Sequence, residues 1–119
     1  MPVRSLSSSV FRWPDREQVD RAAREWIRRE AKRHPELVRA GYFGSYARGD
    51  NGVGSDLDIV AIVSTATEPF AERALCWDLL ELPVPAEIVI YTTEEMDRLV
   101  ADGGRFARTL MAETVWVYP

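Results

Sequence analysis

The sequence predicts an α/β or α+β domain, in which helices are layered on a small β-sheet. Three observations support this class. The run of residues 59–63 is uncharged and mostly β-branched, which is typical of a strand buried on both faces. Apolar residues recur at helical spacing between positions 19 and 27. The predicted elements follow the order helix–strand–turn–strand–helix–strand–helix–helix–strand, so neither helices nor strands form a separate half of the chain.

The length and composition indicate one globular domain. We expect residues 1–119 to form a single domain with a modest core, in which the serine-rich residues 1–13 form a loose N-terminal arm. The contents of 46% hydrophobic and 29% charged residues are those of an ordinary soluble protein. No run reaches the roughly 18 apolar residues of a membrane helix, and the N-terminus lacks the pattern of a secretory signal.

The cysteine content indicates the redox environment of the protein, and the net charge indicates which partners it can bind. Cys76 is the single cysteine of the chain, which excludes an internal disulfide and fits a reducing, cytoplasmic setting. The net charge of −4 argues against a general nucleic-acid binder, because such proteins are usually basic. It leaves nucleotides possible, since a local cluster and a metal ion can hold a triphosphate.

The first helix and the first strand have clear boundaries. Asp15 and Gln18 resemble a capping box directly after Pro14, which predicts a helix start. The pair His34-Pro35 ends this helix, because proline disfavours helical geometry in the residue before it. We expect His34 to have a structural role or to be exposed. The first strand is expected over residues 37–43.

The second half of the chain predicts two more strands and three more helices. After a polar link, we expect a second main helix that ends before the two prolines of residues 82–85. Its apolar stripe comprises Phe70, Ala74, Trp77 and Leu80. Cys76 and the tryptophans of the two long helices are expected in the core.

A strand is expected over residues 86–91. Thr92 and Glu95 then resemble a second capping box, which opens a short helix that Gly103-Gly104 breaks. A last helix over residues 106–112 and a strand over residues 114–118 complete the chain.

A glycine-rich turn and two carboxylates follow the first strand. Gly44-Ser45 is separated by ten residues from Asp56-Leu57-Asp58. Because side chains alternate along a strand, Asp56 and Asp58 point to the same face. Two such carboxylates repel unless a cation lies between them, and Mg²⁺ typically takes one or two carboxylates together with substrate phosphates. Backbone N–H groups of the glycine turn can bind those phosphates.

These residues resemble the Gly-Ser…Asp-x-Asp signature of the DNA polymerase β-like nucleotidyltransferase superfamily. The fuller form Gly-Ser-Tyr-Ala-Arg-Gly-Asp over residues 44–50, with Ser55 before the aspartate pair, resembles the minimal nucleotidyltransferase (MNT) branch. The similarity runs from about Leu37 to the C-terminus. It implies the nucleotidyltransferase fold, which is a small mixed sheet with helices packed mainly on one face.

The resemblance also implies a set of catalytic and metal-binding carboxylates. Asp56 and Asp58 would be Mg²⁺ ligands, and Glu87 falls at the place of the superfamily's third carboxylate, where aspartate is often found. Two ions would stabilise both oxygens of an in-line displacement at a phosphoryl centre. The alternatives are arginine-paired aspartates and a solvated glutamate at a strand end.

Gly44 and Ser45 are interpreted as the phosphate cradle, because glycine permits close backbone approach and serine donates hydrogen bonds. The alternative is an ordinary strand-to-helix turn. Arg48 would bind phosphate oxygens, or it would brace Asp50 or a carboxylate of the site. Tyr46 is left open between packing and a contact to the nucleobase.

The function that the resemblance implies is transfer of AMP from ATP to a hydroxyl of a partner protein. MNT proteins are typically paired with a small helical HEPN protein, and some are antitoxins that transfer AMP to this toxin. One alternative is a non-catalytic antitoxin of the same fold, which would still bind nucleotide. Another is nucleotidyl transfer to a small molecule such as an aminoglycoside. Residues 116–118 (Trp-Val-Tyr) are candidates for the partner interface or for a homodimer contact.

Overall fold

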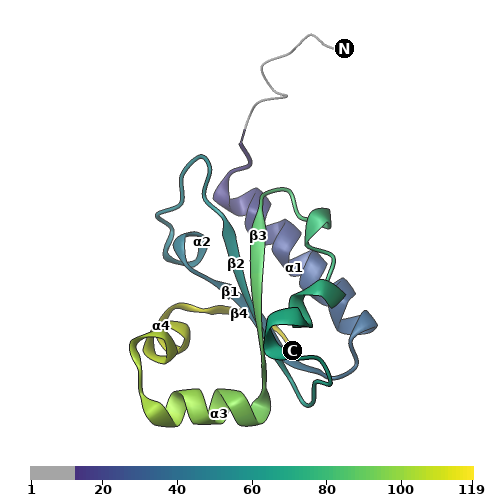
Figure 1. The fold of residues 1–119 in the computed structure, drawn as a ribbon. Coiled ribbons are helices and arrows are strands. Elements are labelled where there is room, and N and C mark those ends of the chain that lie inside the picture. The colour runs from purple at the N-terminus through teal and green to yellow at the C-terminus, as the bar shows by residue number, and fades with distance from the viewer. Residues whose placement is uncertain (1–12) are drawn as a thin grey trace.

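A mixed four-stranded β-sheet forms the centre of the computed structural model, which describes residues 13–119 (Figure 1). The strand order is β3-β2-β1-β4. β1 pairs antiparallel with β2 and β4, whereas β2 and β3 are parallel. The strands are β1 (Leu37–Phe43), β2 (Leu57–Val63), β3 (Ala86–Thr92) and β4 (Val115–Tyr118). All four strands lie where the sequence predicts them. The expected N-terminal arm lies outside the described residues, apart from Trp13.

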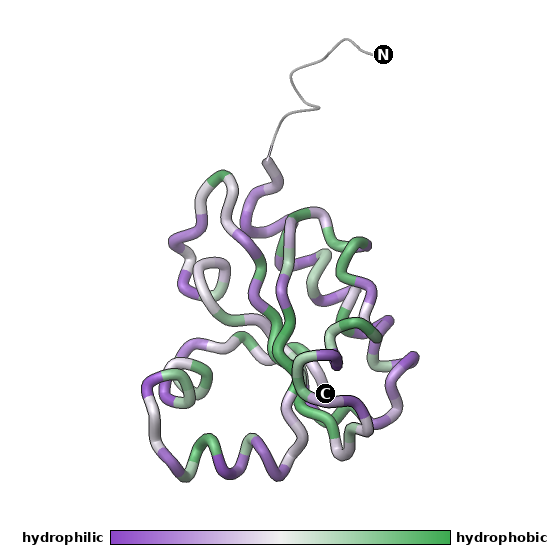
Figure 2. The backbone as a smooth tube through the Cα atoms, in the orientation of Figure 1, coloured by the Kyte–Doolittle hydropathy of each residue, from purple (hydrophilic) through white to green (hydrophobic). Residues whose placement is uncertain are grey.

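Both faces of the sheet are covered by helices. One face packs against α1 (Arg16–Arg33), whose Trp26 and Ile27 are fully buried. The opposite face packs against α3 (Thr93–Asp102) and α4 (Arg105–Glu113). Figure 1 shows α1 and the α3–α4 pair on opposite sides of the strands, and Figure 2 shows the apolar segments gathered along these strands.

The predicted class, a mixed sheet layered with helices, is confirmed. The expectation that the helices pack mainly on one face is wrong in this chain. The reason lies in β2, which buries six of its seven residues and therefore presents apolar side chains to both faces.

The helix boundaries follow the predicted capping signals. Asp15 accepts a hydrogen bond from the Gln18 amide (2.8 Å), and Gln18 accepts one from the Asp15 amide (2.9 Å). α1 ends at Arg33, and the ring of its C-cap residue His34 stacks on Trp77 with 4.0 Å between the ring centroids. Thr92 and Glu95 form the second capping box, at the start of α3. These local signals were sufficient because each involves residues three positions apart.

The predicted second main helix is not formed. Two short 3₁₀ helices, η2 (Phe70–Cys76) and η3 (Leu79–Glu81), take its place. Trp77 lies between them in extended conformation, so the helical spacing is lost after this residue. Trp77 is buried, but Leu80 is 96% exposed, and Cys76 is exposed rather than in the core.

Arg73 supplies the physical reason for this difference. Its guanidinium donates to the carbonyl oxygens of Glu68 (3.2 Å) and Ile90 (3.0 Å) and to both carboxylate oxygens of Glu95 (2.6 and 3.2 Å). The hydrogen bond from Arg73 is the main reason why the pKa of Glu95 falls to about 2. These tertiary bonds tie the segment to β3 and α3, and they override its helical propensity.

Gly41 sets the distance between β1 and β4. A Cβ atom at this position would collide with the carbonyl oxygen of Val115 in the neighbouring strand. The glycine therefore permits the close approach that lets the short β4 complete the sheet.

None of the helices within residues 13–119 is long and apolar enough to cross a bilayer.

We expect Gly41→Ala to lower the free energy of unfolding by about 1–3 kcal/mol, because the added methyl group forces the two strands apart. Gly52→Ala is the control, since a Cβ at that position meets no atom within 4 Å. It should change the free energy by less than about 0.5 kcal/mol. Urea unfolding followed by tryptophan fluorescence measures both. Equal effects of the two substitutions would contradict the close contact between β1 and β4.

Candidate functional site

The carboxylates expected at the site meet at one end of the sheet. Asp58 in β2 is the register partner of Glu87 in β3. Because β2 and β3 are parallel, partners in register lie side by side on the same face. Asp56 directly precedes β2, and alternation along the strand places it on the same face as Asp58. This is the face covered by α3 and α4, since Val60 and Val89, two residues further along each strand, pack there.

The three carboxylates differ in their exposure to solvent. Asp56 and Glu87 are exposed, whereas Asp58 is half-buried. Burial raises the pKa of Asp58, and the negative charges of Glu87 and Asp56 raise it further, while Arg48 acts in the opposite direction. The fold therefore holds these groups together although their charges repel one another. Clusters of this kind are more common at functional sites than elsewhere.

Gly44 lies directly beneath the carboxylate of Asp58. It follows the last residue of β1 and has a φ of +81°, a conformation that favours glycine. A Cβ atom at Gly44 would collide with Oδ2 of Asp58. Only glycine therefore leaves room for this carboxylate against the chain. The short helix α2 (Ser45–Arg48) begins with the half-buried Ser45, so the turn is a strand-to-helix junction.

Arg48 is held by two carboxylates, those of Asp50 and Glu113. Its Nε donates to Oδ2 of Asp50 (3.0 Å), and its Nη1 donates to Oε1 of Glu113 (3.2 Å). The same Oε1 accepts a hydrogen bond from the backbone N–H of Gly44 (3.0 Å). The structure thus contains the carboxylate contacts that were one of the two interpretations of Arg48.

Glu113 is the site residue that sequence reasoning missed. It is the last residue of α4 and lies 69 positions from Gly44. No motif spacing connects the two. The sequence held one weak indication of a role for Glu113. The partial negative charge at a helix C-terminus repels a carboxylate, so a glutamate there is expected to have a positively charged or hydrogen-bonding partner elsewhere.

Tyr46, in the short helix α2, is part of the hydrophobic core. It is 1% exposed, and its hydroxyl accepts a hydrogen bond from the Trp13 indole (3.0 Å) and donates one to the Ser55 carbonyl (3.3 Å). Tyr46 therefore packs, which resolves the choice between packing and a contact to the nucleobase.

A family model of the nucleotidyltransferase domain matches residues 24–117. The chain belongs to the nucleotidyltransferase domain family. This match includes the glycine turn and all three carboxylates, and it confirms the resemblance noted in the sequence. Members of the family generally use a nucleoside triphosphate and a divalent metal ion, so a nucleoside triphosphate is the implied substrate.

A solved structure shares this fold. The structure of a "putative nucleotidyltransferase" from Sulfolobus solfataricus superposes with a TM-score of 0.61. The alignment covers 85% of this chain and 80% of that chain at 22% identity, which establishes a shared fold. No protein with a curated description matches the chain.

The donor set of this nucleotidyltransferase domain suits a hard divalent cation. Asp56, Asp58 and Glu87 offer only carboxylate oxygens, which Mg²⁺ prefers. Within residues 13–119, no three acidic, histidine or cysteine side chains lie close enough to form a complete metal site as they stand. Mg²⁺ also keeps several waters and takes ligands from substrate phosphates, so it does not need a cage made entirely of protein.

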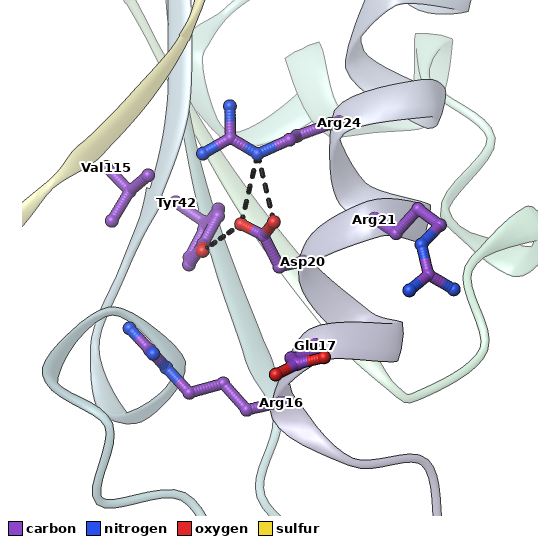
Figure 3. A pocket seen from close by; sticks show the side chains of 7 residues that line it. All are labelled: Arg16, Glu17, Asp20, Arg21, Arg24, Tyr42 and Val115. Carbon is purple, nitrogen blue, oxygen red and sulfur yellow. Dashed lines mark hydrogen bonds and ion pairs between the residues drawn. The ribbon is translucent and has the colours of Figure 1, made fainter.

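The domain has a cleft of about 470 Å³ on the other face of the sheet, between α1 and β1 (Figure 3). Three of its polar side chains are paired with one another: Asp20 accepts from the Tyr42 hydroxyl (2.5 Å) and from Arg24 (3.0 Å). Burial and the bond to Asp20 raise the pKa of Tyr42 to about 12. The hydrogen bonds between Asp20, Arg24 and Tyr42 thus attach α1 to β1, on the face away from the carboxylates.

We expect Gly44→Ala to weaken nucleoside triphosphate binding by about tenfold or more, because the methyl group displaces the Asp58 carboxylate and strains the backbone at a positive φ. Gly103→Ala is the matched control: its φ is +67°, but its Cβ would meet no atom within 4 Å. Isothermal titration calorimetry with Mg²⁺ and ATP measures both. Wild-type affinity in Gly44→Ala would contradict the assigned contact.

Proposed function

We propose that this nucleotidyltransferase is Mg²⁺-dependent and transfers AMP from ATP to a hydroxyl group of a partner protein. The observation that carries the proposal is the register pairing of Asp58 with Glu87, on the same face as Asp56 and against Gly44. A purely structural sheet end gains nothing from placing Asp58 beside two carboxylates whose charges raise its pKa. Their grouping is explained if a cation and a triphosphate bind between them.

Gly44, Ser45 and Arg48 are proposed to bind the triphosphate. The Gly44 amide and the Arg48 guanidinium already converge on one anionic oxygen, that of Glu113. Phosphate oxygens suit the same donors, since hydrogen bonds from charged groups and backbone amides to an anion are strong. The Ser45 hydroxyl follows directly in the chain and is half-buried beside them.

Asp56, Asp58 and Glu87 are proposed as the Mg²⁺ ligands and the catalytic carboxylates. A two-ion site would supply charge neutralisation of the triphosphate and a lowered pKa of the attacking hydroxyl. The acceptor oxygen forms a bond to the α-phosphorus of ATP as the bond from this phosphorus to the β-phosphate oxygen breaks. The hydroxyl proton passes to a carboxylate, for which the exposed Glu87 is suited, and pyrophosphate leaves.

The acceptor is assigned from the resemblance to MNT proteins, which implies a small helical HEPN-type toxin and an antitoxin role. The C-terminal strand is a candidate surface for this partner, or for a second copy of the chain. Trp116 is half-buried, with the Arg39 guanidinium 3.8 Å from its ring centroid, and Tyr118 is half-buried as well. Transfer to a small molecule such as an aminoglycoside is the less favoured acceptor class.

One observation favours a second candidate function, a nucleotide-binding antitoxin that does not catalyse. Glu87 lies where the superfamily often has aspartate. Its exposed side chain is longer than that of an aspartate by one methylene group. A displaced carboxylate there would leave binding intact while it weakened the chemistry.

The decisive assay is transfer of label from α-³²P-labelled ATP to a HEPN-type protein that is the product of the neighbouring gene. We expect Asp56→Asn/Asp58→Asn to lower the labelling rate by about 100-fold or more, because it removes the charges that hold the cation. Asp102→Asn is the control: it removes one exposed acid at the end of α3 and should label at the wild-type rate.

Equal labelling by the wild type and the double variant would refute the assigned catalytic residues. If neither protein labels the partner, yet both bind it and the wild type binds ATP, the non-catalytic antitoxin is the correct function.

A further inference from the structure

The Glu113 carboxylate lies in the position that the proposed function assigns to a phosphate. We infer that Glu113 is an internal substitute for a phosphate oxygen, which occupies the cradle without nucleotide and leaves it when a triphosphate binds. This inference rests on the proposed function, because it concerns regulation of the same site.

The geometry of the contact is that of an anion-binding pair. Oε1 of Glu113 lies 3.0 Å from the Gly44 nitrogen and 3.2 Å from Nη1 of Arg48. One oxygen thus receives a backbone amide and a guanidinium at once. Both are donors assigned to the triphosphate, so Glu113 and a phosphate oxygen cannot use them together.

The surroundings of Glu113 favour an exchangeable contact over a permanent one. The residue ends α4, where the helix dipole disfavours a carboxylate, and its charge adds to those of Asp56, Asp58 and Glu87. Its side chain is 21% exposed, so it can rotate into solvent.

Glu30 shows the contrast. Its side chain is 1% exposed and is held by Arg33 at 2.7 Å, as expected for a permanent buried acid.

The predicted consequence is weaker triphosphate binding than the cradle alone would give. When the competent state is only a fraction of the molecules, the apparent Kd rises by the inverse of that fraction. If Glu113 is docked in about nine of ten molecules, its removal tightens binding about tenfold.

Calorimetric titration with inorganic tripolyphosphate, and separately with ATP, tests this directly in the presence of Mg²⁺. Glu113→Ala is expected to bind both ligands about tenfold more tightly than the wild type. Asp50→Asn is the matched control. It also removes one negative charge that is paired with Arg48, but it leaves the hydrogen bond between the Gly44 amide and Glu113 in place. It should tighten binding by less than about threefold.

Glu113→Gln is a second variant should the alanine variant fail to fold. Its neutral amide oxygen still accepts from Gly44, so it should lie between the wild type and Glu113→Ala. Equal or weaker binding by Glu113→Ala would overturn the inference, since Glu113 would then position the cradle, while the proposed function would stand. Equal tightening by Asp50→Asn and Glu113→Ala would also overturn it, because charge alone would explain the effect.

Two further outcomes separate the inference from the proposed function. Tighter tripolyphosphate binding by Glu113→Ala in a protein that labels no partner would support the inference and refute the proposed transfer. Absence of ATP and tripolyphosphate binding in the wild type and every variant would overturn both.

Discussion

The parallel pairing of β2 with β3 is the constraint on which the rest of the site depends. It fixes Asp58 beside Glu87, and alternation along β2 then brings Asp56 to the same face. A shift of this register by one residue would turn Glu87 to the face packed by α1. The apolar residues that follow on both strands oppose such a shift, because it would also expose the core.

Two glycines allow the backbone to come close enough for this arrangement. Gly41 lets β4 pack against β1, and β4 directly follows the helix that carries Glu113. Gly44 leaves space for the Asp58 carboxylate and offers its amide to an anion. The site is therefore built from strand ends and one helix terminus, which a rigid sheet holds in position. Its charges repel one another, so the arrangement lowers the stability of the fold, which the proposed role of the site in catalysis would explain.

Features encoded by neighbouring residues could be predicted from the sequence. The strands, both capping boxes and the break at Gly103 follow from local patterns, and the Gly44–Asp58 segment indicated the family. The 3₁₀ segments could not be foreseen, because Arg73 is held by Ile90 and Glu95 from later in the chain. Glu113 was missed for the same reason: its contact with Gly44 exists only after α4 and β4 have packed.

The central claim is that the Asp58 carboxylate is held against like charges for the sake of a cation. Unfolding of the wild type and of Asp58→Asn in urea at pH 7, with a chelator and then with Mg²⁺, tests it most directly. We expect the variant to be more stable by about 0.2–1 kcal/mol in the chelator, as for relief of a like-charge pair. Mg²⁺ should reduce or reverse this difference. A variant that is less stable than the wild type in the chelator, and unchanged relative to it in Mg²⁺, would contradict the account.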